Sequence, residues 1–430
     1  MKDNYKYILD KSYSKKTSKI LNQFWAGFII YTTSYMLDVS GVTFSYIGYN
    51  ILYLEILGLA IFIIPAIRLI RFKIQNTYLK NLYIIYYAWL FFIIIRGFSF
   101  NYLYLRATFT DAYFGIFLYL VPLILLFPKD IVYLKKVITV ILILSVIYIL
   151  CDMVFIKALL TSNSDSEEGK TIIEYFSKIL AIPSGFILLT LSYHNDKRKF
   201  RAIVGKLWVL FVIFITFLFA VIRARRGLIF MSLNILFFTY IIYNYVHKSN
   251  LFFKFFPLLI IFFVSIYAIN VYNEKKPGMF GLITERLNED TRSLVENFFY
   301  LDMNKKDWVI GKGIEGSYFC PTSDTEDSIR KVIETDYLQI ILKGGIISLG
   351  LLLLITVPAI FKGLFYSKNI LSKAAAIWIL LWLIDLYPAT VTTFTLNYIL
   401  VWISVGICYS KEIRCMPEEI VKEQFQYKIF

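Results

Sequence analysis

The sequence predicts a polytopic all-α membrane protein with about twelve transmembrane helices. Of its 430 residues, 58% are hydrophobic and only 17% are charged, whereas soluble domains carry roughly 25% charged residues. A soluble protein of this size could not bury that much apolar surface in one core. About 250 apolar residues, at about 20 residues per span, make about twelve helices. Soluble enzymes, secreted disulfide scaffolds and nucleic-acid binders are excluded at this level, so no nucleic-acid partner is expected.

The apolar residues are grouped into runs that are each long enough to cross a bilayer. Polar and basic segments separate these runs, and we expect the boundaries to be correct within several residues. The expected spans are 20–37, 46–67, 82–99, 113–127, 137–156, 175–193, 207–222, 228–246, 252–271, 337–361, 374–389 and 392–409.

The distribution of basic residues predicts the orientation of these spans. If the helices alternate in direction, 27 of the 45 Lys and Arg residues fall on one side. Cytoplasmic segments of membrane proteins carry this excess of positive charge, so both termini are predicted to be cytoplasmic. The formal net charge of +15 is then mostly an orientation signal. The basic N-terminus has no apolar core, so no cleaved signal peptide is expected.

One large hydrophilic segment, 273–336, separates the ninth and tenth spans on the outer side. It holds nine basic and 13 acidic residues, a net charge of −4. Apolar residues between Leu282 and Phe299 recur at helical spacing, which predicts amphipathic helices. The expected organisation is 1–272 with spans one to nine, 273–336 as an extracytoplasmic helical loop, 337–409 with spans ten to twelve, and 410–430 as a cytoplasmic tail.

A short outer connection, Arg223-Ala224-Arg225-Arg226-Gly227, breaks the charge bias. Guanidinium groups bind phosphate bidentately and stay charged, so Arg223, Arg225 and Arg226 are suited to clamp a lipid-linked diphosphate. The alternative is ordinary contact with lipid headgroups. In the long loop, Arg286 and Arg292 are further candidates for phosphate binding. The alternative for Arg292 is ion pairing with nearby glutamates.

Ionisable residues within or beside the predicted spans share a similar depth. Isolated charges in lipid are costly, so these residues are expected to face a polar cavity that opens to the outer side. Long basic side chains at helix ends can instead reach the interface. The residues at the outer edge are Asp38, Arg96, Asp152, Lys178, Lys343 and Asp385, and Glu55 lies nearer the midplane.

Acid–base chemistry on the outer side must use a group other than histidine. His194 and His247 are the only histidines, and both fall in cytoplasmic segments. Glu334 and Asp336, just before the tenth span, are placed for a general base. The alternative is a helix N-terminus, where acidic residues are common. Tyr337 follows these two carboxylates at the start of the tenth span.

Two motifs that suggest other chemistry are discounted. Residues Gly311 to Gly316 fit the dinucleotide pattern G-x-G-x-x-G, but no βαβ unit surrounds them, so a tight turn after Trp308-Val309-Ile310 is expected. The four cysteines, Cys151, Cys320, Cys408 and Cys415, have no CxxC spacing. Neither a disulfide framework nor a metal site is expected.

These features together resemble the bacterial superfamily of O-antigen polymerases and O-antigen ligases. The resemblance covers the architecture of most of the chain. In sequence it is confined to about 223–227, 308–316 and 334–345, where the last segment opens Glu-Thr-Asp-Tyr-Leu-Gln-Ile-Ile-Leu-Lys-Gly-Gly-Ile. The ligase branch typically carries a histidine about eleven residues before a glycine, and the matching residue before Gly345 is Glu334. This departure favours the polymerase branch.

The resemblance implies a GT-C-like membrane glycosyltransferase of the bacterial cytoplasmic (inner) membrane that needs neither metal nor cofactor. Its donor and acceptor would be undecaprenyl-diphosphate-linked oligosaccharides, and a chain-length regulator is a possible partner. Glu334 or Asp336 would take the acceptor proton, the arginines would hold the diphosphate, and the polar cavity would receive the acceptor, with lining residues Tyr337, Asp152, Asp385 and Arg96.

Two alternatives remain. A ligase would transfer finished polymer to a lipid A core or another acceptor. A transporter of lipid-linked oligosaccharide would use the intramembrane charges as a pathway, although these charges stop near mid-membrane at Glu55.

Overall fold

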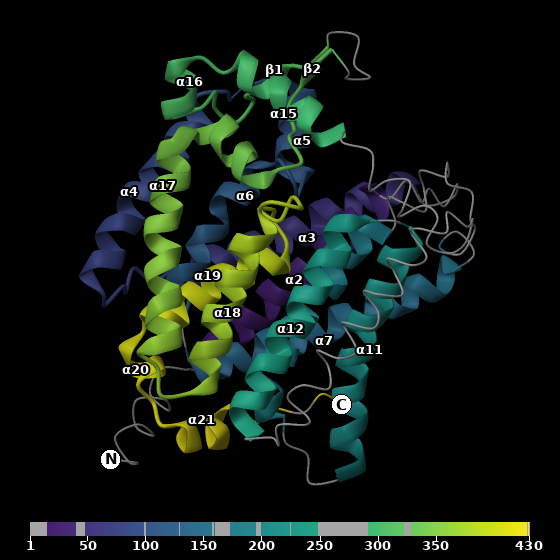
Figure 1. The fold of residues 1–430 in the computed structure, drawn as a ribbon, viewed down its shortest axis with the longest axis vertical. Helices are drawn as coiled ribbons and strands as arrows, with labels where there is room; N and C mark the ends of the chain where they lie inside the picture. The colour runs from purple at the N-terminus through teal and green to yellow at the C-terminus, as the bar shows by residue number, and fades with distance from the viewer. Residues whose placement is uncertain are drawn as a thin grey trace, which may run out of the picture.

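The computed structural model is an all-α bundle with one short hairpin of strands (Figure 1). Six of its described helices, α3, α4, α7, α11, α12 and α17, are long and apolar enough to cross a membrane. This confirms an all-α protein with membrane-spanning character. The structure describes residues 15–39, 48–98, 100–128, 130–156, 159, 173–194, 199–223, 225–247, 291–321, 328–427 and 429.

The longer helices coincide with the apolar runs of the sequence. They are α2 (Lys15–Val39), α3 (Gly48–Leu69), α4 (Thr77–Ile95), α7 (Ile131–Val154), α11 (Lys199–Ile222), α12 (Arg226–His247), α17 (Asp336–Phe365), α18 (Ile370–Asp385) and α19 (Leu396–Tyr409). The expected span 252–271 lies outside the described residues.

Two of the expected spans are built from short helical pieces. In 113–127 the α-helix gives way to a 3₁₀ segment with Pro122 in its first turn. In 175–193 a π-helical turn precedes Pro183 and a short α-helix. Proline lacks an N–H group and interrupts helical hydrogen bonding, which explains both breaks. The pieces are α6 (Ile116–Leu120), η1 (Val121–Leu126), η2 (Ser177–Ala181), α10 (Ser184–Leu189) and η3 (Leu191–Tyr193).

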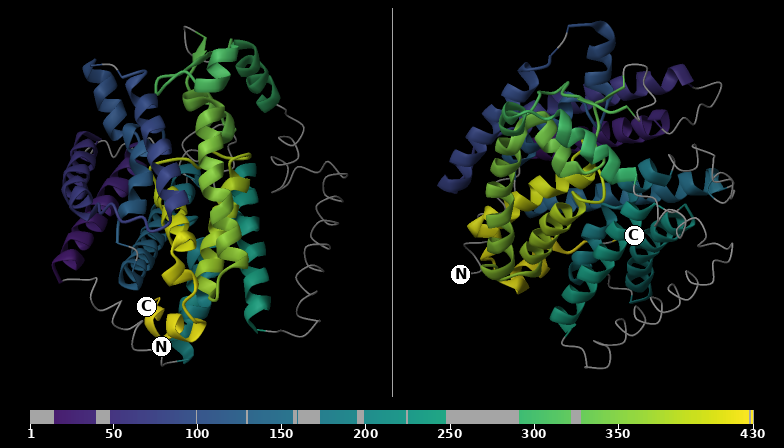
Figure 2. Two further views of the ribbon diagram at one scale, coloured as in Figure 1. Left: turned by 90° about the vertical axis from the view of Figure 1, so that its left-hand side faces the viewer. Right: turned by 45° about the horizontal axis from the view of Figure 1, so that its top comes forward.

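A small lobe lies at one end of the bundle, above the start of α17 (Figures 1 and 2). We call it the α15–α16 lobe. The shorter elements are α5 (Tyr102–Thr110), α15 (Thr291–Asp302), α16 (Lys305–Ile310), β1 (Tyr318–Phe319) and β2 (Ile329–Arg330), with α20 (Lys411–Arg414) and α21 (Glu418–Phe425) at the opposite end.

The lobe has its own hydrophobic core. Phe299, Tyr318 and Ile333 are buried there against Leu338 and Leu342 of α17. The first turns of α17 therefore belong to both the lobe and the bundle. The predicted boundary at 336 falls where this long helix begins. The part of the predicted loop before residue 291, including Arg286, lies outside the described residues.

The predicted glycine turn after α16 is confirmed. Gly311 and Gly313 have φ angles of 70° and 86°, which glycine adopts without steric penalty. The Gly313 N–H group donates to the Lys343 carbonyl at 2.9 Å. Among the described residues no βαβ unit surrounds the turn. These glycines therefore join the lobe to a kink in α17.

The kink itself is at Gly345, where φ is 69° and ψ is −179°. A Cβ atom at this position would lie 2.0 Å from the Val309 carbonyl oxygen, closer than any real contact. Position 345 therefore admits only glycine, both for its backbone conformation and for its packing against α16.

We predict that Gly345→Ala lowers stability by about 1–3 kcal/mol or more, because the alanine would impose a strained backbone and a clash. Gly350→Ala in the same helix is the matched control, since a Cβ atom there meets nothing within 4 Å. It should be neutral or stabilising by up to about 1 kcal/mol. Thermal unfolding of both purified variants in the same detergent checks this, and equal melting temperatures would contradict it.

Candidate functional site

Asp336 is the first residue of α17, and its side chain is 1% exposed. Its Oδ2 accepts hydrogen bonds from the backbone N–H groups of Val391 at 2.9 Å and Thr392 at 2.6 Å. Its own N–H group donates to the Leu386 carbonyl at 2.9 Å. The residue therefore fastens the connection between α18 and α19, residues 386–395, to the start of α17.

Asp336 also lines a cavity. Oδ1 makes no hydrogen bond of good geometry among the described residues, but the Thr392 hydroxyl group is close enough to interact with this carboxylate. The cavity has a volume of about 50 Å³, enough for a water molecule or a hydroxyl group. Its lining includes Gln339 and Lys343. Buried carboxylate oxygens without a close partner are costly. Asp152 and Asp385 have them as well, but Asp336 is the one of these three residues that lines this cavity, which makes it a functional candidate.

Two cations lie on one side of this carboxylate, joined through Glu174. Lys178 Nζ is 2.6 Å from Glu174 Oε1, and Arg225 Nη1 is 3.0 Å from Glu174 Oε2. Lys178 is also close enough to interact electrostatically with Asp336. The adjacent Lys178 ammonium group lowers the pKa of the Glu174 carboxyl, and Arg225 adds to this effect. The arginine turn is thereby linked to Asp336 through charged side chains.

The three arginines of the turn have different environments. Arg223 is buried, and its Nε donates to the Leu159 carbonyl at 3.2 Å. Arg225 pairs with Glu174, and Arg226 at the start of α12 is exposed. Arg223 therefore binds a backbone carbonyl group, whereas the side chains of Arg225 and Arg226 reach the surface.

Arg292 and Glu334 also lie beside the 386–395 connection. Their side chains form an ion pair of 3.4 Å, and Arg292 also donates to the Pro388 carbonyl at 3.3 Å. A Cβ atom on Gly227 would lie 2.8 Å from this same carbonyl oxygen, so the arginine turn also contacts the connection. The fold thus gathers the arginine turn, Arg292, Glu334 and Asp336 around one connection.

Glu334 and Asp336 differ sharply in burial. The Glu334 side chain is 63% exposed and forms an ion pair with Arg292. It does not line the cavity that Asp336 lines. Thr335 between them donates its hydroxyl to Glu296 and makes no side-chain cap on α17. Asp336 is therefore the better placed of the two candidate bases.

The remaining cavity candidates are spread out. Arg96 ends α4, and its Nη2 donates to the Ile310 carbonyl at 2.7 Å, so it holds the α16 end. Asp385 is buried at the end of α18 near Asn234. Asp152 is buried near Tyr148. Tyr337 stacks on Tyr387 beside the site.

Glu174, Gln339 and Thr392 were not identified from the sequence. The spacing of Glu174 and Lys178, four residues apart, is the one signal that could have indicated their pairing. Among the described residues, no group of His, Cys, Asp and Glu side chains is arranged to hold a metal ion. The four cysteines are free.

No protein-family model, curated protein or solved structure matches this chain.

We predict that Asp336→Ala destabilises the protein by about 1–3 kcal/mol, because two buried N–H groups lose their acceptor. Asp336→Asn should retain nearly full stability, since its amide oxygen can accept both bonds. Melting temperatures of the two variants in detergent check this. Equal losses in both would show that the charge, and not the acceptor, holds the connection.

Proposed function

We propose that this protein is a membrane glycosyltransferase that polymerises lipid-linked saccharide repeat units. The observation that carries the proposal is the buried Asp336 carboxylate, which lines a cavity and lies close enough to Lys178 to interact electrostatically, with Arg225 linked to Lys178 through Glu174. A general base beside positive charge suits a reaction in which a hydroxyl group loses a proton and an anionic group departs.

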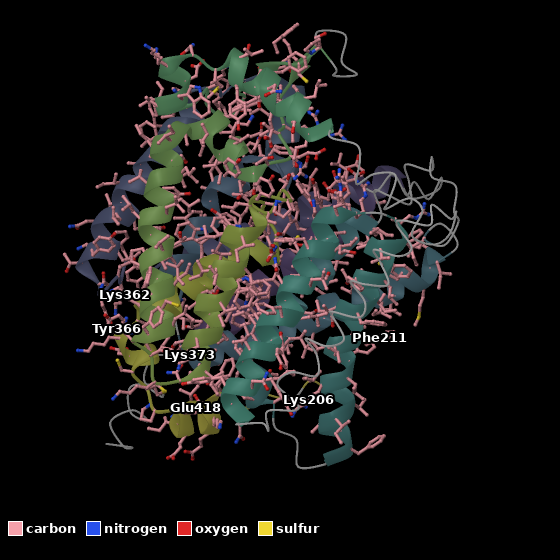
Figure 3. All side chains as sticks on the ribbon, in the orientation of Figure 1. Lys206, Phe211, Lys362, Tyr366, Lys373 and Glu418 are labelled. Atoms are coloured by element: carbon pink, nitrogen blue, oxygen red, sulfur yellow. The ribbon has the colours of Figure 1, made fainter. Side chains whose placement is uncertain are left out.

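The proposal includes twelve spans in a GT-C-like arrangement, with the α15–α16 lobe on the outer side of the bacterial cytoplasmic membrane. In Figure 3, Lys206, Lys362 and Lys373 lie in the half of the molecule that carries α20 and α21. Cytoplasmic ends of membrane proteins are enriched in such lysines. This supports placing α20, α21 and both termini in the cytoplasm.

In the proposed reaction, a hydroxyl oxygen of the incoming repeat unit attacks the anomeric carbon of the donor glycan. The bond from that carbon to undecaprenyl diphosphate breaks, and the diphosphate leaves with the electron pair. Asp336 Oδ1 takes the hydroxyl proton. Direct displacement inverts the anomeric configuration. Glu334 does not line the same cavity and instead holds Arg292.

The departing diphosphate is assigned to Arg225 and Arg226, with Arg292, which binds the 386–395 connection at Tyr387 and Pro388. Guanidinium groups placed in advance stabilise charge that develops in the transition state. Glu174 pairs with both Lys178 and Arg225, so a bound diphosphate would compete with the Glu174 carboxylate for these two cations. Arg223 is assigned a structural role because it binds the Leu159 carbonyl.

The test of the function is the size distribution of lipid-linked and exported glycan in a strain that lacks this protein. Collapse of the polymer ladder to single repeat units supports the polymerase. Full-length polymer left on undecaprenyl diphosphate would make the protein a ligase. Repeat units retained on the cytoplasmic face would make it a transporter.

We predict that Asp336→Asn lowers chain extension by about 10²–10⁴-fold, the usual contribution of a general base. Glu334→Gln should retain activity within about tenfold, because a ground-state ion pair at an exposed site contributes little. Complementation of the deletion strain with each variant, at matched membrane levels, measures this. A larger loss for Glu334→Gln than for Asp336→Asn would reverse the assignment.

We predict that replacing both Arg225 and Arg226 with lysine lowers the rate by roughly 10²-fold, because charge is kept but the bidentate fork is lost. Arg201→Lys, near the other end of α11, is the control and should behave as the wild type. The same complementation assay applies. Full activity in the double variant would reduce these arginines to headgroup contacts.

A further inference from the structure

Four aromatic rings from four different segments come together beside the site. Trp308 of α16 and Tyr300 of α15 are parallel, with ring centroids 6.0 Å apart and an interplanar angle of 7°. Tyr337 of α17 and Tyr387 of the 386–395 connection are also parallel, at 6.5 Å and 10°. The hydroxyl groups of Tyr300 and Tyr337 interact and join the two pairs. We call these four residues the aromatic row.

The row is open to the surroundings. Tyr387 is 61% exposed and Tyr300 is 42% exposed, whereas Trp308 and Tyr337 are partly buried behind them. The neighbouring Tyr318 is buried in the lobe core and is not available. Exposed large rings lose hydrophobic stabilisation unless a partner covers them. The row therefore indicates a binding surface.

Acidic side chains accompany the rings. The Glu296 carboxylate is close enough to act electrostatically on both Tyr300 and Tyr337. At the other end, Arg292 links the Tyr387 carbonyl, at 3.4 Å, with Glu334. The surface thus offers flat apolar faces beside carboxylates and phenol groups that accept and donate hydrogen bonds.

This combination suits a glycan. Sugar rings present a face of C–H groups that stacks on aromatic rings, and hydroxyl groups at their edges that bond to carboxylates. A bilayer interface also attracts Tyr and Trp. However, the Glu296 carboxylate beside the rings disfavours the anionic headgroups of a bacterial membrane, and the adjacent Arg292 is already paired with Glu334. A saccharide is therefore the occupant that these neighbours favour.

We infer that the aromatic row is a glycan-binding platform that holds the saccharide chain beside Asp336. The inference rests on the proposed function for its substrate class, and it deepens that function. Tyr387 lies in the same 386–395 connection that Asp336 fastens through Val391 and Thr392. A chain that lies along the row therefore ends at the reacting centre. Loss of the row should release the chain early and shorten the polymer, while the first bond still forms.

Binding can be tested separately from catalysis. The probe is a mixture of oligosaccharides released by mild acid hydrolysis from the surface polysaccharide of the source bacterium, added to the purified full-length protein in detergent. Saturation-transfer NMR should detect binding, and Tyr387→Ala and Trp308→Ala should each weaken it roughly three- to tenfold, the size of one lost aromatic contact. Tyr387→Phe keeps the ring and should bind as the wild type. Phe319→Ala removes a ring that is exposed on the same lobe but lies outside the row, and it is the matched control.

The polymer ladder then separates the two proposals. In the complemented deletion strain, Tyr387→Ala should shorten the modal chain length at least about twofold and leave dimers of the repeat unit unchanged in amount. No binding by the wild type, or equal binding by all variants, overturns the platform. If oligosaccharide binding depends on the row but the polymer ladder persists in the strain that lacks this protein, the platform is supported and the polymerase proposal is wrong. Binding of phosphatidylglycerol that is lost in Tyr387→Ala, with no binding of the oligosaccharides by the wild type, would assign the row to lipid and overturn the platform.

Discussion

The Asp336 carboxylate binds the backbone N–H groups of Val391 and Thr392, and the whole functional end of the molecule depends on this contact. Backbone groups that lie inside or beside a bilayer must find partners within the protein. The connection between α18 and α19 has no helical partners for these groups, and one carboxylate oxygen of Asp336 supplies them. The same residue lines the cavity. A single side chain thus serves both the fold and the proposed chemistry.

The connection fixed in this way organises the charges around it. The arginine turn approaches it at Gly227, and Arg292 binds it through the Pro388 carbonyl. Glu174 and Glu334 each hold one of the arginines, Arg225 and Arg292, at this end of the bundle. Paired carboxylates keep the guanidinium groups in place in the absence of substrate. In the proposed reaction, a diphosphate with more negative charge would replace these carboxylates as the partner of the arginines.

The long helices were predictable because an apolar run must form a helix to cross a bilayer. The expected span 337–361 corresponds to α17 (Asp336–Phe365), and 137–156 corresponds to α7 (Ile131–Val154). Hydropathy measures only the apolar run, however, and not the backbone path within it. The kink at Gly345 depends on close packing against Val309 of α16, which is distant in sequence, so the pattern could not indicate it. The break before Pro183 follows from the proline, which a hydropathy pattern does not weigh.

The site was predictable as a set of candidate residues and not as an arrangement. Glu334 and Asp336 are equivalent in the sequence, and only packing against the 386–395 connection buries one and exposes the other. Arg223 and Arg225 are two residues apart at a helix end, where successive side chains diverge around the axis. Three neighbouring arginines therefore could not be expected to point in one direction. In the fold, Arg223 binds the backbone carbonyl of Leu159.

Reconstitution most directly tests the claim that this protein itself joins lipid-linked units. The purified protein would be placed in proteoliposomes that contain only undecaprenyl-diphosphate-linked repeat units, and the lipid-linked products and free undecaprenyl diphosphate would be measured over time. The account predicts a ladder of lipid-linked oligomers with one undecaprenyl diphosphate released for each bond formed. Repeat units that remain single, or that only cross the bilayer, would contradict it.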